Sequence, residues 1–331
     1  MEAFQFSQAS TVNSALEAGR SQKETKYVAG GTTLIDLMKL NVETPKKVVD
    51  INSLPLAQIE STPDGGLKIG AMVRNSDLAH DETVQHRYTV LSEALLSGAS
   101  PQLRNMATTG GNLLQRTRCY YFRDTAYPCN KREPGSGCPA IDGFNRIHAI
   151  LGTSEHCIAT HPSDMAVAMM ALEAMVHLQG SHGERSVALN DFYLLPGSTP
   201  NRENVLAPGD LITYVTLPPL AKGTRSHYLK LRDRASYEFG LSSAAVAVLL
   251  NGNRIERVRI ALGGVGTKPW RSREAEQALE GQEASENNFR AAAEAALEGA
   301  KPRHDNAFKI ELAKRCLTRT LKNVTQSASN E

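Results

Sequence analysis

Residues 27–40 read YVAGGTTLIDLMKL, in which a short β-like run leads through a Gly-Gly turn into a helical pattern. On both sides of this stretch the pattern continues: a β-like run at 3–6 and a helix at 11–18 precede it, and a β-like run at 47–51 follows. This alternation predicts a small α/β domain at 1–53. Its strand-turn-helix segment can receive a pyrophosphate on successive backbone N–H groups, where a side chain in place of glycine would hold the phosphate away.

A second Gly-Gly turn occurs at 107–114, ATTGGNLL. Such turns are common in ordinary loops, and the first one is not G-x-G-x-x-G, so a Rossmann site is not indicated. Two of them in one chain favour nucleotide binding only modestly.

The rest of the chain predicts two further domains. We place the second at 54–218, beginning with a hairpin around Asp64-Gly65-Gly66 and containing an irregular insertion at about 116–160. Pro218-Pro219 and the following residues read as a linker. The third domain, 222–331, has β-like runs at 228–232, 244–250 and 255–262 and then helices at 271–279, 288–297 and 306–321.

Overall charge and apolar runs exclude two classes of partner. Lys plus Arg total 37 against 35 Asp plus Glu, so the net charge of +2 gives no field of the kind that nucleic-acid binders use. No apolar run is long enough to cross a bilayer, and the first residues do not resemble an export signal.

Four of the five cysteines fall within one short interval, with spacing C-x9-C-x8-C-x18-C. Four thiolates can hold an iron-sulfur cluster, whereas zinc ribbons usually use two close C-x2-C pairs, which are absent here. Spacing alone leaves zinc, a pair of disulfides or four free thiols open. The candidate ligands are Cys119, Cys129, Cys138 and Cys157. The fifth, Cys316, belongs to an apolar helical stripe and predicts a buried core thiol.

Five motifs occur in an order that resembles one family. They are AGGTTLIDLMK (29–39), LRNMATTGGNLLQ (103–115), SDMAVAMMALEA (163–174), YLKLRDRASYEFGLSSAAVAV (228–248) and ALGGVGTKPWR (261–271). Together they resemble the FAD subunit of the xanthine dehydrogenase and aldehyde oxidoreductase family of molybdenum hydroxylases, most closely that of bacterial periplasmic aldehyde oxidoreductases. The resemblance runs nearly from end to end of the chain.

The resemblance implies an α+β fold of the PCMH-type: two α/β FAD-binding subdomains and a C-terminal α/β domain with a three-stranded sheet and helices. It also implies the FAD contacts. The pyrophosphate turn would be Val28, Ala29, Gly30, Gly31, Thr32, Thr33 and Leu34, and the flavin side would be lined by Thr108, Thr109, Gly110, Gly111 and Asn112. Asp164 and Lys230 match the family's FAD-contacting Asp and Lys. Without the family they would be an ordinary helix-start carboxylate and a surface lysine.

In the members that carry the cysteine insertion, it binds a [4Fe-4S] cluster, and the resemblance rather than the spacing names this cluster type. The family also implies a heterotrimer. A large molybdenum-cofactor subunit oxidises an aldehyde, a small subunit with two [2Fe-2S] clusters relays electrons, and this chain receives them on FAD and passes them to an external acceptor. No catalytic residue for substrate is then expected here. Periplasmic location would follow from co-export with a partner that carries the signal, with the cytoplasm as the alternative.

Two other functions remain open at this stage. One is a stand-alone PCMH-type flavin oxidase, and the other is a zinc-stapled nucleotide-binding scaffold. Cations also crowd the cysteines in the sequence, and we expect them to favour the reduced cluster. They are Arg116, Arg118, Arg123, Lys131 and Arg132.

Overall fold

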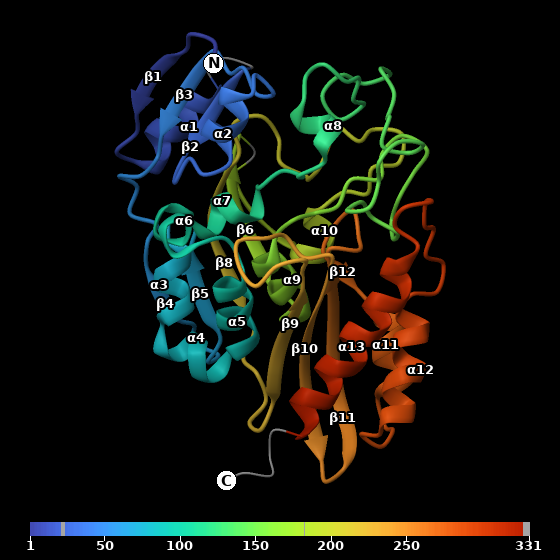
Figure 1. Cartoon of the computed structure of the whole chain (residues 1–331). Coiled ribbons are helices and arrows are strands. Elements are labelled where there is room, and N and C mark those ends of the chain that lie inside the picture. Colours follow the sequence, from blue (N-terminus) through green and yellow to red (C-terminus); the bar gives the residue numbers. More distant parts are fainter. Residues whose placement is uncertain (21–23, 182, 327–331) are drawn as a thin grey trace.

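The computed structural model describes residues 1–20, 24–181 and 183–326. In this part of the chain the strands form three sheets, which follow one another along the sequence (Figure 1). The sheets fall in the order of the three predicted domains, and we keep the boundaries 1–53, 54–218 and 222–331 as our proposed division. No helix among the described residues combines the length and the apolar character that a membrane span requires.

The first sheet is parallel, with strand order β1-β3-β2, and two helices connect its strands. Parallel neighbours need crossovers, which explains why strands and helices alternate in the sequence. Ala15 and Leu16 of α1 pack with Val49 of β3 to form a small core. The elements are β1 (Gln5–Gln8), α1 (Val12–Arg20), β2 (Thr25–Val28), α2 (Leu34–Lys39) and β3 (Lys47–Asp50).

The second sheet is antiparallel, with order β4-β5-β8-β6-β7. Gly65, with φ +85°, makes the predicted hairpin turn between β4 and β5, because a positive φ suits glycine. The strands are β4 (Ile59–Ser61), β5 (Leu67–Gly70), β6 (Met175–Gly180), β7 (Gly183–Ala188) and β8 (Leu211–Leu217). The helices are α3 (Asn75–His80), α4 (Glu82–Arg87), α5 (Thr89–Ser97), α6 (Pro101–Met106), α7 (Thr109–Leu113), α8 (Tyr120–Arg123), α9 (Asp164–Ala171) and α10 (Leu189–Phe192).

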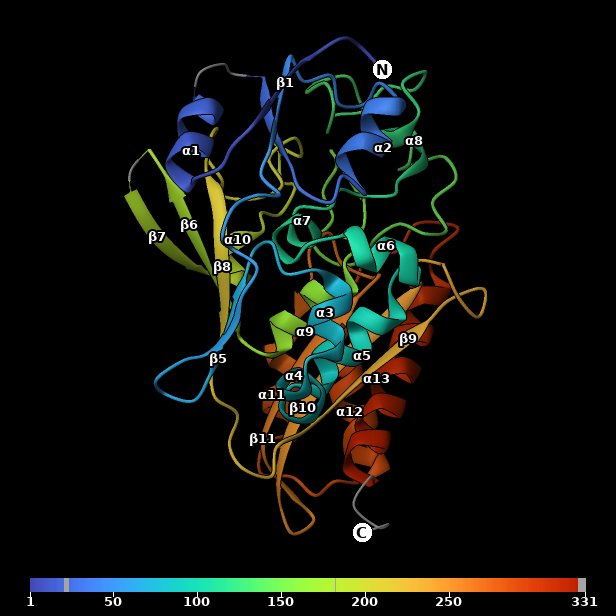
Figure 2. The ribbon, with the colours of Figure 1, turned by 90° about the vertical axis from the view of Figure 1, so that its left-hand side faces the viewer.

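Helix α9 lies at the centre of the molecule. Its sequence, MAVAMMA after Asp164, is apolar on all sides, and every residue from Met165 to Ala171 is buried. The helix contacts α5 on one side and strands β10 and β11 of the third sheet on the other (Figure 2). This double contact fixes α5 against the third sheet, with Asp164 at the start of the helix that joins them.

The third sheet is antiparallel, with order β12-β11-β10-β9, and α13 packs on β9 and β10. Three strands were expected here. The fourth, β12, has only two residues and follows Pro269, so it carries no recognisable pattern. The elements are β9 (Arg225–Leu231), β10 (Ser242–Asn251), β11 (Arg254–Gly263), β12 (Trp270–Arg271), α11 (Arg273–Leu279), α12 (Glu286–Ala296) and α13 (Phe308–Gln326).

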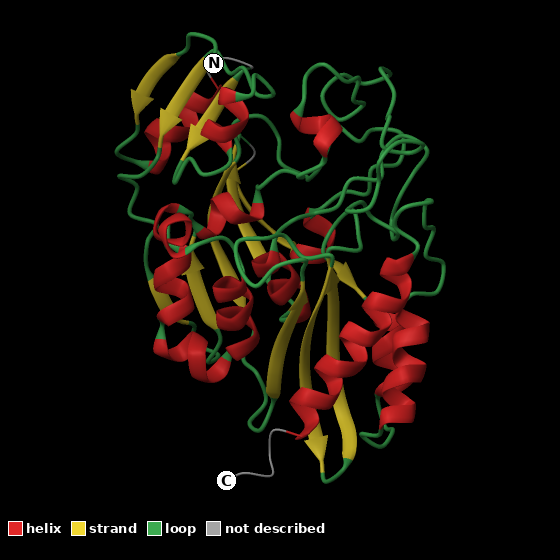
Figure 3. Ribbon diagram, in the orientation of Figure 1, coloured by secondary structure: helices red, strands yellow, loops and turns green. Residues whose placement is uncertain are grey.

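The predicted insertion is almost entirely irregular, with α8 as its single helix in the described chain (Figure 3). The C-terminal domain anchors it. The buried Lys309 ammonium donates to the carbonyls of Ile147 and His148 as well as to that of Gly264, which directly follows β11. On the same helix Cys316 is fully buried, as predicted for a core thiol.

Candidate flavin site and cysteine cavity

A cavity of about 540 Å³ opens where the first sheet's helix α2, the second domain and the β9–β10 loop meet. This volume lies in the range of small-molecule and cofactor sites. Of the predicted FAD residues, those that line it are Thr32, Thr33, Gly111, Asn112, Asp164 and Lys230. We call it the flavin cavity. It brings together predicted residues from four separate motifs.

The first glycine turn has the free donors that a pyrophosphate needs. No described residue accepts a hydrogen bond from the backbone N–H groups of residues 30–33, which precede α2. Buried or partly buried N–H groups without a protein acceptor are uncommon unless water or a ligand takes the bond. Gly31 has φ +72°, a conformation that turns the chain into the helix. The turn therefore fits an anionic group in the place that the sequence predicted.

Gly30 has a second role that the sequence did not reveal. A Cβ on this residue would lie 1.9 Å from the carbonyl oxygen of Met106, the last residue of α6, which directly precedes the second glycine turn. Glycine at position 30 therefore allows the two glycine turns to pack together. No local sequence signal reports this, since the two segments are 76 residues apart along the chain (106 minus 30).

Replacing Gly30 with alanine is expected to force these two turns apart. We expect a loss of stability of about 1–3 kcal/mol from overpacking and weaker retention of FAD. Gly240→Ala is the matched control, because a Cβ there meets the Lys230 side chain and the Ser242 carbonyl oxygen at ordinary contact distances of 3.4–3.7 Å. Equal FAD retention in both variants, measured after gel filtration, would contradict the proposed role of Gly30.

The second glycine turn uses its own donors for folding. The N–H groups of Thr109 and Gly110 donate to the carbonyls of Val73 and Ala71, and the Gly111 N–H donates to the Thr108 hydroxyl. Thr108, Thr109 and Gly110 therefore hold the turn in place. Gly111 and Asn112 are the residues of this turn that border the flavin cavity.

Asp164 and Lys230 form a nearly buried ion pair on the cavity wall. The Lys230 ammonium lies 2.8 Å from Oδ2 of Asp164, and their side chains are 3% and 12% exposed. The Tyr228 hydroxyl donates to Oδ1 of Asp164 at 2.6 Å. Burial, and then the Asp164 carboxylate, raise the pKa of Tyr228 well above its usual value, so its hydroxyl remains a donor. Lys230 also donates to the Ser97 carbonyl. The ion pair joins α9 to β9, and both of its residues line the flavin cavity.

The flavin cavity has further walls that sequence reasoning missed. Asp36, Arg118 and Arg123 line it, as do Tyr237 and Phe239 of the β9–β10 loop. The two arginines lie in the cysteine insertion, and both pair with Asp36 of α2. Tyr237 and Phe239 are 56% and 41% exposed, which is high for aromatic side chains. No sequence signal could have identified these rings, because single exposed apolar residues are normal on protein surfaces.

The four cysteines of the insertion converge. Cys119, Cys129, Cys138 and Cys157 all line one small cavity with free volume of about 10 Å³, although they come from separate parts of the loop. We call it the cysteine cavity. All four are free thiols, which removes the disulfide alternative for this structure. His148 directs Nε2 at the Cys119 sulfur, 3.1 Å away. Among the described residues, no three His, Cys, Asp or Glu side chains are arranged to hold a metal ion, so metal binding remains a prediction.

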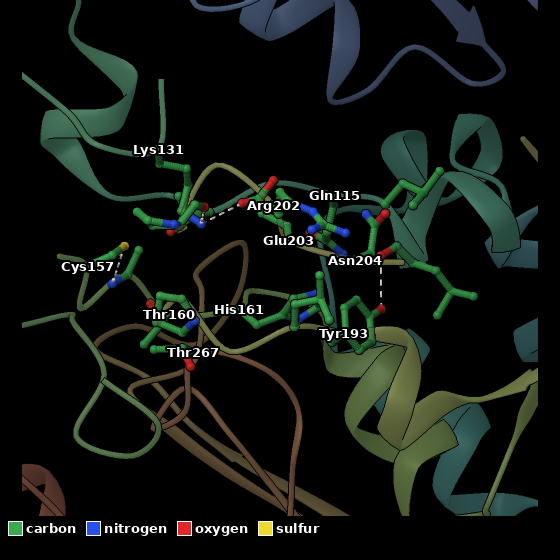
Figure 4. Close-up of a pocket in the computed structure, with 17 residues that line it drawn as sticks. Gln115, Lys131, Cys157, Thr160, His161, Tyr193, Arg202, Glu203, Asn204 and Thr267 are labelled. Carbon is green, nitrogen blue, oxygen red and sulfur yellow. Dashed lines mark hydrogen bonds and ion pairs between the residues drawn. The ribbon is translucent and has the colours of Figure 1, made fainter. Parts of the chain in front are cut away.

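A third, polar cavity lies beside Cys157, and its walls include Glu203 and Lys131 (Figure 4). The Glu203 carboxylate accepts from Arg116 Nε at 2.6 Å and lies 3.0 Å from the Lys131 ammonium. Burial opposes its ionisation, but Arg116 and then Lys131 outweigh burial and lower the pKa of Glu203 to about 2. Glu203 thus attaches the insertion to the loop before β8.

The same contacts revise the expectation that cations around the cysteines favour the reduced cluster. Arg116 pairs with Glu43 and Glu203, Lys131 with Glu203, and Arg118 and Arg123 with Asp36. Arg132 instead donates to the backbone carbonyls of Tyr121, Phe122 and Tyr127. Three carboxylates therefore balance part of this positive charge, and the cations hold the insertion in place through these contacts.

Comparison with known proteins agrees with this arrangement. Residues 2–220 match the family model described as the FAD-binding domain in molybdopterin dehydrogenase, and residues 227–324 match the CO dehydrogenase flavoprotein C-terminal domain. The chain is 51% identical to the aldehyde oxidoreductase FAD-binding subunit PaoB of Escherichia coli, over 97% of this chain and 98% of that one. It is 28% identical to the glyceraldehyde dehydrogenase medium chain of Sulfolobus acidocaldarius, over 86% and 83% of the two chains.

Solved structures give the same result for the fold. The chain superposes on a carbon monoxide dehydrogenase chain from Hydrogenophaga pseudoflava with a TM-score of 0.77 and 26% identity, covering 98% of this chain and 97% of that one. The α+β fold expected from the resemblance is thereby confirmed. The chain belongs to the FAD-binding subunits of the molybdopterin dehydrogenase family, and it is an FAD-binding oxidoreductase subunit.

Proposed function

We propose that this chain is the electron-transfer subunit of a three-subunit, molybdenum-dependent aldehyde oxidoreductase. Its FAD would receive electrons from the two [2Fe-2S] clusters of a small subunit, while a large molybdenum-cofactor subunit oxidises the aldehyde. The substrate class comes from the likeness to the Escherichia coli aldehyde oxidoreductase subunit, which extends over nearly the whole of both chains. Bound flavin can accept electrons singly and deliver them in pairs.

The chain's own residues would bind and orient the flavin. The free N–H groups of residues 30–33 fit the pyrophosphate, and Asp164 and Lys230 provide a fixed pair of charges on the opposite domain. Asn112 is held by the Ser163 hydroxyl, which also caps α9, so the second turn and Asp164 share one support. A site fixed from both sides in this way is preorganised for its ligand.

We also propose that Cys119, Cys129, Cys138 and Cys157 bind a [4Fe-4S] cluster. The observation that carries this proposal is the convergence of all four thiols on the cysteine cavity. One tetrahedral zinc ion would draw its four sulfurs to within about 3.8 Å of one another, given Zn–S bonds of about 2.3 Å. A four-iron cluster binds one thiolate per iron, so its ligands stand further apart. Among the described residues no such close set of ligands occurs, so we choose the cluster over zinc on the resemblance to the family members that carry the cysteine insertion. Because the free volume of the cysteine cavity is only about 10 Å³, the surrounding loop would have to widen to hold the cluster.

Replacing Cys129 with serine tests the cluster proposal. We expect the variant to lose about four iron atoms per chain and to have a lower melting temperature, because the cluster joins distant parts of the loop. Cys316→Ser is the control, since this thiol lies in the core of α13 far along the chain and should leave iron content unchanged. Full iron content in Cys129→Ser would overturn the ligand assignment.

The stand-alone flavin oxidase makes a different prediction. It would bind substrate over the flavin and turn over without other subunits, whereas the proposed subunit requires partners for aldehyde oxidation. We further propose a periplasmic location, reached by co-export with a partner that carries the signal. Fractionation of cells that produce all three chains tests the location directly.

A further inference from the structure

The cysteine insertion also forms a wall of the flavin cavity. Arg118 immediately precedes Cys119, and Arg123 ends the helix α8 that follows this cysteine. Both arginines line the cavity, as do Thr32 and Thr33 of the first glycine turn. The segment that presents a proposed cluster ligand therefore also presents two cations to the proposed FAD site.

One carboxylate fixes both arginines. Asp36 Oδ2 lies 3.2 Å from Arg118 Nη1 and 2.9 Å from Arg123 Nη1. Asp36 belongs to α2, which begins directly after the turn with the free N–H groups. Two guanidinium groups against one carboxylate leave a surplus of one positive charge beside the turn. The phosphate groups of FAD carry negative charge, and arginine binds phosphate through paired N–H donors.

The positions of the arginines are themselves well supported. Their side chains are 26% and 23% exposed, so each is held largely within the structure while still bordering the cavity. Arg118 also packs over the Phe239 ring at 4.9 Å, which ties it to the β9–β10 loop on the far wall. Neither arginine can move away without disturbing α2 or this loop.

We propose that Arg118 and Arg123 bind the phosphate groups of FAD, so that the order of the four-cysteine insertion sets the affinity of the chain for FAD. This inference rests on the proposed FAD and cluster sites. It adds two phosphate ligands outside the glycine turns and couples the two cofactor sites through Cys119 and its neighbours. Coupling of this kind is reciprocal: FAD binding stabilises the ordered insertion as much as the ordered insertion stabilises FAD.

The decisive comparison is between FAD and riboflavin, which has the same ring system without phosphate. Dissociation constants for both are measured by flavin fluorescence on flavin-free protein, using the full chain together with the subunits that accompany it. The variant is Arg118→Gln/Arg123→Gln. The control is Arg146→Gln, an insertion arginine that pairs with Asp233 and does not line the flavin cavity.

We expect the double variant to bind FAD about 10- to 100-fold more weakly, the effect of losing charged hydrogen bonds to phosphate. Its affinity for riboflavin should change by less than about twofold, because riboflavin has no phosphate for the arginines to bind. Loss of even one charged hydrogen bond would change the affinity by more than this. Equal weakening for both ligands would mean that the arginines only support the fold, and unchanged FAD affinity would also overturn the proposal. If the wild-type protein bound no FAD, the proposed function itself would fail, which is a different result.

Cys129→Ser tests the coupling, because it removes a proposed cluster ligand without touching the cavity wall. We expect this variant to bind FAD more weakly by about tenfold, the change that 1.4 kcal/mol produces. An iron-free Cys129→Ser protein with wild-type FAD affinity would show that the insertion keeps its order without the cluster. That outcome would overturn the coupling.

Discussion

Replacing Lys230 with methionine is expected to lower the free energy of unfolding by about 3–5 kcal/mol and to empty the flavin site. The substitution leaves the Asp164 carboxylate, which is 12% exposed, with the Tyr228 hydroxyl as its remaining side-chain partner. A buried charge without a counter-charge is strongly destabilising, and here it lies on the wall of the flavin cavity. Chemical denaturation and the flavin content after gel filtration measure the two effects.

Two further variants identify the cause. Lys314→Met removes a lysine whose acidic partners, Glu294 and Glu311, are about two-thirds exposed, so it should cost less than about 1 kcal/mol. Combining Lys230→Met with Asp164→Asn should recover part of the lost stability, because the stranded charge is gone. A Lys230→Met protein as stable as Lys314→Met would show that the ion pair contributes nothing.

Replacing Glu203 with glutamine is expected to lower the free energy of unfolding by a similar amount, about 3–5 kcal/mol at neutral pH. The change leaves Arg116 and Lys131, whose side chains are 19% and 10% exposed, without the carboxylate they share. Arg116 keeps Glu43 and Lys131 keeps the Pro200 carbonyl, but the ion pairs that join the insertion to the loop before β8 are lost. Denaturation of both proteins across a pH series measures this difference.

The pH dependence of that difference has a defined sign. The pKa of Glu203 is lowered from 4.5 to about 2, so its contribution to stability is complete above about pH 4.5 and is lost as pH falls toward 2. The difference in unfolding free energy between wild type and Glu203→Gln should be constant from pH 5 to pH 8, where the Glu203 carboxyl is ionised in both the folded and the unfolded protein. It should shrink below about pH 4.5. Glu60→Gln removes an exposed pair with Lys68 and should give a small difference at every pH. A Glu203 effect that grew in acid would contradict the ion network.

Local sequence patterns were sufficient for the first domain and for the main strands of the others. Strands β1, β2 and β3 and helices α1 and α2 follow the predicted alternation with shifts of one or two residues. Helices α3, α4 and α6 have six residues each, too few to show a helical period, and were missed. Strand β7, GERSVA, is a polar strand at the edge of its sheet, where burial does not shape the sequence.

The parts of the candidate site that depend on local sequence were predictable, whereas those that depend on contacts between distant segments were not. The first glycine turn is a local feature, so its free N–H groups could be anticipated from residues 28–34. Asp164 and Lys230 are 66 residues apart, and their pairing depends on how α9 packs against β9, which no local pattern records. They were found only through the resemblance to the family. Arg118 and Arg123 were assigned to the cysteines alone, because the sequence does not show that the insertion folds over α2.

The most direct test of the central claim is the FAD and iron content of the full chain, purified through a tag from cells that contain its partner subunits. We expect two further chains to co-purify and about one FAD per copy of this chain, released by heat. Iron should exceed that of two [2Fe-2S] clusters by about four atoms, owing to the cluster at Cys119, Cys129, Cys138 and Cys157. A colourless chain that purifies alone, without flavin or iron, would contradict both the FAD site and the cysteine cluster.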